Sequence, residues 1–173
     1  MTAATPIADE VAARLRRRQN SEHPELWSLL DRVRDPEIPV ISIWDLGVLR
    51  DIRIEDNTLL VVITPTYSGC PAMQAIENDI RDTLTGRTGY AVRVVTELAP
   101  AWSTEHMTPA GRQALQDYGI APPRPLHAAD RVVTCPRCGA GNTRLISQFG
   151  STACKALYQC GECREPFDYF KCI

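Results

Sequence analysis

The chain lacks most of the sequence features that indicate an enzyme active site. No glycine-rich phosphate loop, no Ser-His-Asp order and no helix with paired carboxylates occurs in its 173 residues. Such motifs supply the phosphate cradle, the activated nucleophile or the acid–base pair of common enzyme classes. Their absence weakens any claim that this chain is an enzyme.

Long hydrophobic runs are also missing. No segment approaches the roughly 20 apolar residues that cross a bilayer. The first 19 residues contain a run of arginines, Arg16 to Arg18, where a secretory signal would have an apolar core. We therefore expect a cytoplasmic protein without a membrane partner, in a compartment where thiols stay reduced.

Cysteine is scarce in most of the chain. Residues 1–130 contain only Cys70, whereas the other six of the seven cysteines lie between Cys135 and Cys172. This is not the disulfide framework of a secreted domain. Charge follows the same division, with 13 basic and 18 acidic residues in 1–130 but six and three in 131–173. The basic tail lacks a dense cluster interleaved with aromatics, so we expect no nucleic-acid partner.

The pattern of apolar residues predicts an α+β domain. Spacings of three and four residues indicate helices over Ile7–Gln19, from Pro24 to before Pro36, and over Ala72–Leu84. Alternation predicts strands at Val48–Ile54, Thr58–Thr66 and Tyr90–Leu98. The segment 38–47 contains too many special residues for a regular element and is expected to be an ordered loop. The expected fold is a small three-stranded sheet packed with helices, followed by a C-terminal β-rich zinc ribbon.

Domain boundaries follow from proline and glycine. Thr108-Pro109 is typical of a helix start and Gly119 of a helix end, so a short helix is expected between them. The stretch Ala121-Pro-Pro-Arg-Pro125 is the most linker-like in the chain. We therefore predict an N-terminal extension (1–23), a main domain (24–120), a proline-rich linker (121–130) and a ribbon (131–173).

Two pairs of cysteines predict a metal site. Cys135-Pro-Arg-Cys138 and Cys160-Gly-Glu-Cys163 each place two thiols on a tight turn beside a glycine, and two such turns complete a tetrahedron. The 21 residues between the pairs suffice for two strands, expected at 143–149 and 152–158. Zinc is the expected ion, with iron in a four-thiolate centre as the competitor. A domain of about 40 residues would owe much of its folding free energy to this ion.

Cys154 and Cys172 fall outside these pairs. One interpretation is that both pack as small hydrophobic residues on the ribbon. The other is that they contribute to a second, labile metal or cluster site. The sequence leaves both open.

Cys70 stands directly before Pro71 and is expected to be the N-cap of the helix at 72–84. A helix N-terminus favours a thiolate, which would make the sulfur more nucleophilic and a better ligand. The alternative is an inert thiol buried at a strand–helix turn.

Three polar positions have weaker signals. Asp45 precedes Leu46-Gly47 and is compatible with a simple Asx turn. Glu37, in Asp35-Pro36-Glu37, is compatible with a helix terminator carrying solvated charges. His106 is a candidate ligand, but a lone histidine is usually structural or exposed.

Two longer stretches carry a resemblance to a known family. Asp35-Pro-Glu-Ile-Pro-Val-Ile-Ser-Ile-Trp-Asp-Leu-Gly47 and Thr64-Pro-Thr-Tyr-Ser-Gly-Cys-Pro-Ala-Met73 resemble the SufT-like iron–sulfur assembly domain. The tail from Phe149 to Cys172 resembles that of the PaaD family, accessory components of the phenylacetyl-CoA ring epoxidase of aerobic phenylacetate breakdown. The resemblance extends from about Leu26 onward.

This resemblance implies a factor that matures or maintains a partner's metal centre, in the di-iron oxygenase or its iron–sulfur reductase. It implies Cys70 as the ligand of a transient iron–sulfur cluster or iron, with Asp45 and Glu37 near it, and a structural zinc in the ribbon. The competing hypothesis is a non-catalytic structural subunit of the oxygenase complex. The sequence leaves the oligomeric state open, a homodimer included.

Overall fold

The computed structural model describes residues 6–124 and 132–171, which form two compact units divided after Thr108. The sequence places this division after residue 120, whereas the helix before the proline-rich stretch belongs to the second unit. Residues 6–23, predicted to be an extension, belong to the first unit. Of the predicted linker, Ala121 lies in a strand and residues 125–130 are outside the described residues.

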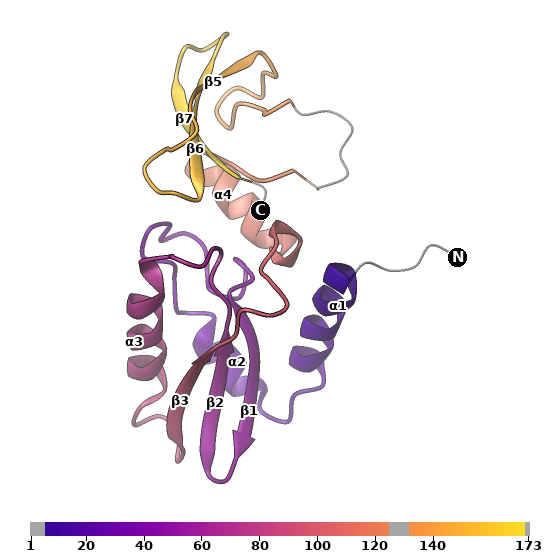
Figure 1. Cartoon of the computed structure of the whole chain (residues 1–173), viewed down its shortest axis with the longest axis vertical. Helices are drawn as coiled ribbons and strands as arrows, with labels where there is room; N and C mark the ends of the chain where they lie inside the picture. The colour runs from indigo at the N-terminus through magenta and orange to yellow at the C-terminus, as the bar shows by residue number, and fades with distance from the viewer. Residues whose placement is uncertain (1–5, 125–131, 172–173) are drawn as a thin grey trace, which may run out of the picture. The chain divides into compact units, whose positions relative to one another are not determined.

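The first unit is built on a three-stranded sheet in the order β1-β2-β3 (Figure 1). β1 (Leu49–Glu55) and β2 (Thr58–Ile63) form an antiparallel hairpin. Both residues of its turn, Asp56 and Asn57, have positive φ, which matches the right-handed twist of the strands. β3 (Ala91–Thr96) pairs with β2 in parallel, with α3 (Ala72–Leu84) in the crossover between them. The predicted α+β fold is confirmed.

Helices provide the rest of this core. α3 lies alongside β3 and α2 (Pro24–Leu30), while α1 (Pro6–Gln19) lies alongside β1 and the 3₁₀ turn η1 (Thr104–His106). The buried helical residues recur at the three- and four-residue spacings of one face: Leu26, Trp27 and Leu30 in α2, and Ala72, Ile76, Ile80 and Leu84 in α3. These buried faces belong to the hydrophobic core of the first unit.

The loop between α2 and β1 is as deeply buried as the helices. Ile41 and Ile43 are fully buried although neither lies in a strand or helix. The backbone bonds Asp35 N–H to Ile41 O and Ile43 N–H to Val33 O fold the loop back on itself. Its polar groups are thus satisfied without a sheet, as burial requires.

The second unit contains α4 (Pro109–Tyr118) and a four-stranded sheet in the order β4-β7-β6-β5. The strands are β4 (Ile120–Ala121), β5 (Thr143–Ser147), β6 (Lys155–Cys160) and β7 (Pro166–Phe170). The sequence predicts β5 and β6 but misses β4 and β7. No helix among the described residues has both the length and the apolarity to cross a bilayer.

Candidate metal centre and the Cys70 turn

The structure brings together the four cysteines of the ribbon. The sulfurs of Cys135, Cys138, Cys160 and Cys163 all lie within 4.8 Å of one another. Across the two turns, Cys135 Sγ is 3.8 Å from Cys163 Sγ and Cys138 Sγ is 3.6 Å from Cys160 Sγ. Four sulfurs at about 2.3 Å from one tetrahedral ion would be about 3.8 Å apart. The two distances across the turns match this value, and the arrangement therefore fits the ligand set of a four-thiolate ion.

Backbone N–H groups surround these sulfurs and favour thiolates. The N–H groups of Cys163 and Glu162 point at the Cys160 sulfur and, against the opposing effect of burial, lower the pKa of Cys160 to about 7. The N–H of Ala140 acts in the same direction on Cys138 Sγ, but the neighbouring cysteines and burial outweigh it and raise the pKa of Cys138. The Glu165 N–H is likewise outweighed by burial and the neighbouring cysteines, which raise the pKa of Cys163 to about 12. Such N–H bonds orient the ligands and spread their negative charge.

The two cysteine turns share a backbone shape. The residue after the second cysteine has positive φ in both, at Gly139 (φ 76°) and at Arg164 (φ 65°). Gly161 is required for another reason: a Cβ there would lie 2.6 Å from the side-chain nitrogen of Asn142. The backbone carbonyl of that asparagine accepts the Gly161 N–H, 2.7 Å away, and so joins the two turns.

A small apolar cluster supports the cysteine site. Its buried members are Ala121, Val133, Cys135, Cys160 and Phe167, and Tyr158 and Tyr169 pack against them. Tyr158 stacks on Phe167 with ring centroids 6.0 Å apart. A cluster of this size buries little area, so a bound ion would contribute much of the free energy of folding.

Cys154 takes no part in this site. It is buried, and its sulfur lies 3.0 Å from the hydroxyl of Thr152. Among residues 6–124 and 132–171, the four ribbon cysteines are the one group of three or more metal-ligating side chains that lie close together. Cys172, the other residue of the predicted second site, lies outside the described residues.

The sequence predicts Cys70 to be the N-cap of α3, but Cys70 is the residue before the N-cap. Pro71 is the N-cap of α3, and Cys70 occupies the turn before it, half-buried. Its sulfur accepts hydrogen bonds from the Ala72 N–H and the Thr66 hydroxyl. Burial nevertheless raises the pKa of Cys70, and the carboxylates of Asp35 and Glu37 raise it further. The expectation of a thiolate favoured by the helix was wrong, because burial and two acidic neighbours outweigh the helix terminus.

The two acidic neighbours come from the loop after α2. Asp35 is buried, and its Oδ1 accepts the N–H groups of Glu37 and Ile38 at 2.8 and 2.9 Å. This Asx turn fixes the backbone at Glu37. The Glu37 carboxylate is one of the two charges that raise the pKa of Cys70.

Asp45 is engaged elsewhere. Its two carboxylate oxygens accept the hydroxyls of Ser42 at 2.7 Å and of Thr108 at 2.6 Å. Its carbonyl also accepts the Thr108 N–H at 3.0 Å. Asp45 therefore links Thr108, at the end of the first unit, to the buried loop between α2 and β1.

His106, the last residue of η1, has a structural role. It is almost fully buried, its Nδ1 accepts the Ser103 N–H at 3.0 Å, and burial lowers its pKa. A Cβ on Gly47 would lie 2.5 Å from the His106 Cβ, and Gly47 has φ 86°. Glycine at the end of Asp45-Leu46-Gly47 is therefore explained by close packing and backbone shape rather than by chemistry.

Arg14 is the buried residue that sequence reasoning missed. Only 1% of its surface is exposed, and its guanidinium donates to the carbonyls of Leu49 at 2.7 Å, His106 at 3.0 Å and Trp44. It also lies 3.6 Å from the centroid of the Trp44 ring. Burial lowers the pKa of Arg14 to about 9, so the group stays charged at neutral pH. The periodicity of α1 shows a basic face but not which arginine is buried.

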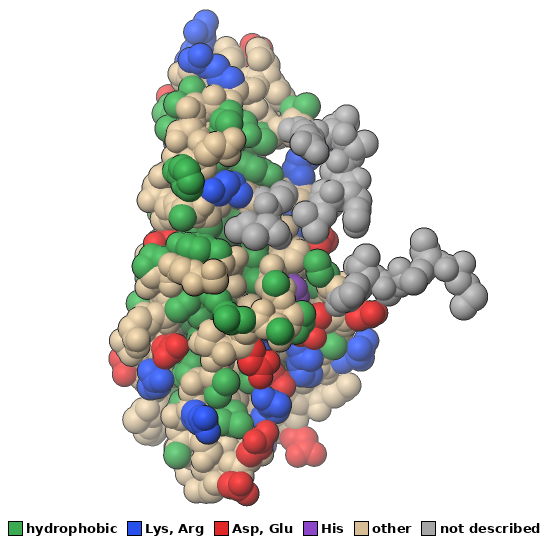
Figure 2. Space-filling model, in the orientation of Figure 1, with side chains coloured by type: hydrophobic (Ala, Val, Ile, Leu, Met, Phe, Trp, Pro, Cys, Tyr) green, Lys and Arg blue, Asp and Glu red, His purple; other side chains and the backbone are tan. Residues whose placement is uncertain are grey.

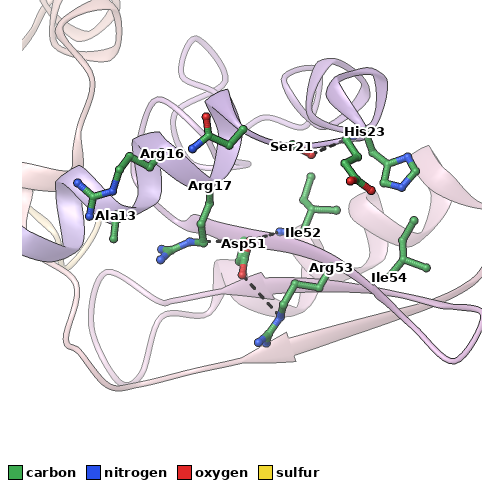
Figure 3. A pocket seen from close by; sticks show the side chains of 11 residues that line it. Ala13, Arg16, Arg17, Ser21, His23, Asp51, Ile52, Arg53 and Ile54 are labelled. Atoms are coloured by element: carbon green, nitrogen blue, oxygen red, sulfur yellow. Dashed lines mark hydrogen bonds and ion pairs between the residues drawn. The ribbon is translucent and has the colours of Figure 1, made fainter.

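An open groove of about 650 Å³ lies between the C-terminal half of α1 and β1 (Figure 3). Its charges compensate one another: Arg17 and Arg53 lie 3.8 and 3.6 Å from Asp51. In both pairs the Nε atom of the arginine makes the contact with the Asp51 carboxylate (Figure 3). The ion pair between Arg17 and Asp51 links α1 to β1 at this groove.

Two family models match the chain in separate parts. The PaaD zinc beta ribbon domain matches residues 120–171, and the iron–sulfur cluster assembly protein model matches residues 24–96. A relative from Escherichia coli (strain K12), named as a putative 1,2-phenylacetyl-CoA epoxidase subunit, is 51% identical over 152 residues, which cover 86% of this chain and 92% of the relative. The chain belongs to the PaaD family. The ribbon match begins at the residues of β4, which agrees with the pairing of β4 to β7.

Two other similarities concern the first unit of this PaaD-family chain. The "Fe-S protein maturation auxiliary factor" of Porphyromonas gingivalis (strain ATCC BAA-308 / W83) is 32% identical over 94 residues, covering 53% of this chain and 86% of the relative. The crystal structure titled "Domain of Unknown Function DUF59 from Bacillus anthracis" matches with a TM-score of 0.50 and 28% identity, over 54% of this chain and 90% of that one. Both similarities cover about half of this chain, which agrees with the match of residues 24–96 to the iron–sulfur cluster assembly protein model.

Proposed function

We propose that this PaaD-family chain assembles or maintains a metal centre, iron–sulfur or di-iron, in the oxygenase or reductase of the phenylacetyl-CoA epoxidase system. The observation that carries the proposal is Cys70, half-buried on the turn before α3 within the electrostatic reach of Asp35 and Glu37. The names of the two relatives support both halves of it: an epoxidase subunit and a maturation factor. The setting is expected to be the cytoplasm, without nucleic acid as a partner.

The electrostatics of the Cys70 turn suit a cationic cargo. The negative charges of Asp35 and Glu37 raise the pKa of the thiol because they oppose a second anion nearby. The same charges attract Fe²⁺ or a cluster, which replaces the proton on the sulfur. Cargo binding therefore releases a proton and relieves the repulsion among the three groups.

The number of ligands favours transfer over storage. Within residues 6–124 and 132–171, no group of three metal-ligating side chains includes Cys70. One thiolate with at most outer carboxylates holds iron weakly, so a client that offers more ligands removes it readily. We propose Cys70 as the transient ligand, Glu37 as an electrostatic neighbour and Asp45 as a residue that holds the surrounding loop.

The four ribbon cysteines have a different proposed role. Their four sulfurs lie within 4.8 Å of one another, and the apolar cluster buries Cys135 and Cys160, which supports a structural zinc site. Zinc has no redox chemistry, so the ion would stabilise the ribbon rather than join the transfer. Elemental analysis of the purified chain distinguishes zinc from iron in this site.

Cys70→Ala is expected to abolish cargo binding and leave the ribbon intact. Incubated anaerobically with Fe²⁺ and sulfide, the wild-type chain should gain visible absorption that the Cys70→Ala variant lacks. Zinc content should be equal in the two proteins. Cys154→Ala, which removes a buried thiol elsewhere, should behave as wild type. Equal absorption from the Cys70→Ala variant would refute the role of Cys70.

Glu37→Gln is expected to make the Cys70 thiol more reactive. Removing this negative charge lowers the pKa of Cys70, although burial, the larger cause of the rise, remains. At a pH below that pKa the thiolate fraction then increases, and alkylation by iodoacetamide should be about twofold faster. Peptide mass spectrometry of the zinc-loaded protein isolates the rate at Cys70. Glu25→Gln, at an exposed position of α2, is the matched control; an unchanged rate in Glu37→Gln would contradict the assignment.

The second candidate function is a structural subunit of the oxygenase complex. The name of the Escherichia coli relative, which calls it a subunit, favours this function. The metal content of the oxygenase and reductase, each produced with and without this chain, separates the two functions. Full metal content without the chain, together with loss of turnover, would favour the structural subunit.

A further inference from the structure

We propose that the outer edge of the ribbon, formed by Arg144, Leu145, Ile146, Phe149 and Lys171, docks an extended apolar segment of the client protein that carries carboxylates at its ends. This inference rests on the proposed function, since it names the surface by which the chain recognises its client. It concerns residues distant in sequence from Cys70 and outside the ligand set of the ribbon.

The edge exposes apolar side chains beside an unpaired strand. Leu145 is 42% exposed, Ile146 48% and Phe149 69%. β5 is the last strand of the order β4-β7-β6-β5, so no other described strand pairs with its outer side. Exposed apolar residues along a free strand edge provide both parts of strand addition: backbone hydrogen bonds and side-chain contacts.

A β-bulge shapes this edge. Leu145 is opposite Tyr158 and Ser147 is opposite Leu157, so Ile146 is an extra residue in β5. The bulge explains why two consecutive apolar residues, Leu145 and Ile146, are both exposed. Bulges redirect side chains and are frequent beside functional surfaces.

The loop that carries Phe149 is firmly braced. A Cβ on Gly150 would lie 2.5 Å from Asp168 Oδ1, and the Ser151 hydroxyl donates to Asp168 Oδ2 at 2.8 Å. The buried Lys155 lies 3.5 Å from the same carboxylate. The backbone next to Phe149 is therefore fixed while its ring stays outside the core. A braced, exposed aromatic loses little conformational entropy on binding, which is typical of an interface anchor.

Positive charges lie at both ends of the edge. Arg144 donates to Gln159 Oε1 at 3.1 and 2.6 Å, a neutral partner. Lys171 Nζ donates to the Gln148 carbonyl at 3.1 Å and lies 4.8 Å from the Phe149 ring centroid. Neither cation forms an ion pair with a described carboxylate, whereas Lys155 does. On the visible face of the second unit, hydrophobic side chains lie among Lys and Arg side chains with few acidic ones (Figure 2).

These features together favour a protein segment as the ligand of this edge. Carboxylates at its two ends would meet Arg144 and Lys171, and apolar residues between them would cover Leu145, Ile146 and Phe149. A nucleic acid would leave the two aliphatic side chains without a stacking partner. The client's own extended segment satisfies both the charge and the apolar surface.

The test measures binding of the full-length, zinc-loaded chain to the purified oxygenase and reductase components by biolayer interferometry. Phe149→Ser and Lys171→Glu should each weaken binding to the client at least about tenfold. Tyr118→Ser, which removes another exposed aromatic of the second unit, and Arg93→Glu, which reverses an exposed charge on β3, should change it less than twofold. Zinc content and far-UV circular dichroism verify that every variant is folded.

Three outcomes overturn the inference. Wild-type affinity in Phe149→Ser and Lys171→Glu would show that the client docks elsewhere. Unchanged client binding with a loss of self-association in those variants would identify the edge as an interface between copies of this chain. No binding of the wild-type chain to either component would remove the client as occupant. The proposed function fails by a different result, namely equal metal content in clients made with and without the chain.

Discussion

Cys160→Ser is expected to release the ribbon ion and unfold the second unit while the first unit stays folded. The substitution removes one of two buried thiolates whose sulfurs complete the tetrahedral group. Loss of a ligand should weaken zinc binding about 1000-fold or more, equivalent to about 4 kcal/mol. The small apolar cluster of the ribbon cannot compensate for that loss.

Two measurements separate the units in this experiment. All three tryptophans, Trp27, Trp44 and Trp102, precede residue 109, so tryptophan fluorescence reports the first unit alone. Zinc affinity follows from competition with a chromophoric chelator. Cys154→Ser is the matched control, because it changes a buried ribbon thiol that is no ligand, and it should retain zinc. Wild-type zinc affinity in Cys160→Ser would contradict the four-cysteine assignment.

Arg14→Ala is expected to destabilise the first unit by about 3 kcal/mol. The substitution removes the contact with the Trp44 ring and leaves the carbonyls of Leu49 and His106 without these donors in the interior. Arg14→Lys should lose about 2 kcal/mol, because an ammonium group cannot reach several carbonyls in the geometry of the planar fork. Denaturant unfolding followed by tryptophan fluorescence gives both values.

The control for Arg14 lies on the same helix. Arg16 is exposed, and Arg16→Ala should change the free energy of unfolding by less than about 0.5 kcal/mol. The emission of Trp44 should also change in Arg14→Ala and not in Arg16→Ala, since only Arg14 lies 3.6 Å from that ring. Equal stability of the Arg14→Ala and Arg16→Ala variants would mean that α1 is held by its surface ion pairs instead.

Much of the fold follows from local pattern. The helix at 72–84 is predicted to the residue, because its apolar stripe, the preceding proline and the glycine at 86 all agree. The hairpin and the cysteine turns can be predicted from the sequence equally well, since each depends on residues close in the chain. β7 is missed although Pro166-Phe-Asp-Tyr-Phe170 alternates, because a strand of five residues that begins with proline gives only a short pattern.

The site is harder to predict where it depends on distant contacts. The position of Cys70 before α3 suggests an activated thiolate, yet Asp35 and Glu37, about 35 residues earlier, help raise its pKa. Asp45 belongs to the same loop as Glu37 but binds Thr108, 63 residues later. Arg14 contacts residues 30, 35 and 92 positions away. The sequence shows which residues are charged but not which distant residues will bury or pair with each charge.

The pairing of β4 with β7 bears on how the ribbon can be isolated for study. Ile120 and Ala121 are opposite Asp168 and Tyr169, so the strand before the proline-rich stretch completes the sheet of the metal site. A fragment starting at residue 132 would expose the free side of β7 as a template for aggregation. Fragments intended for spectroscopy or crystallisation should therefore start at or before Pro109, where α4 begins.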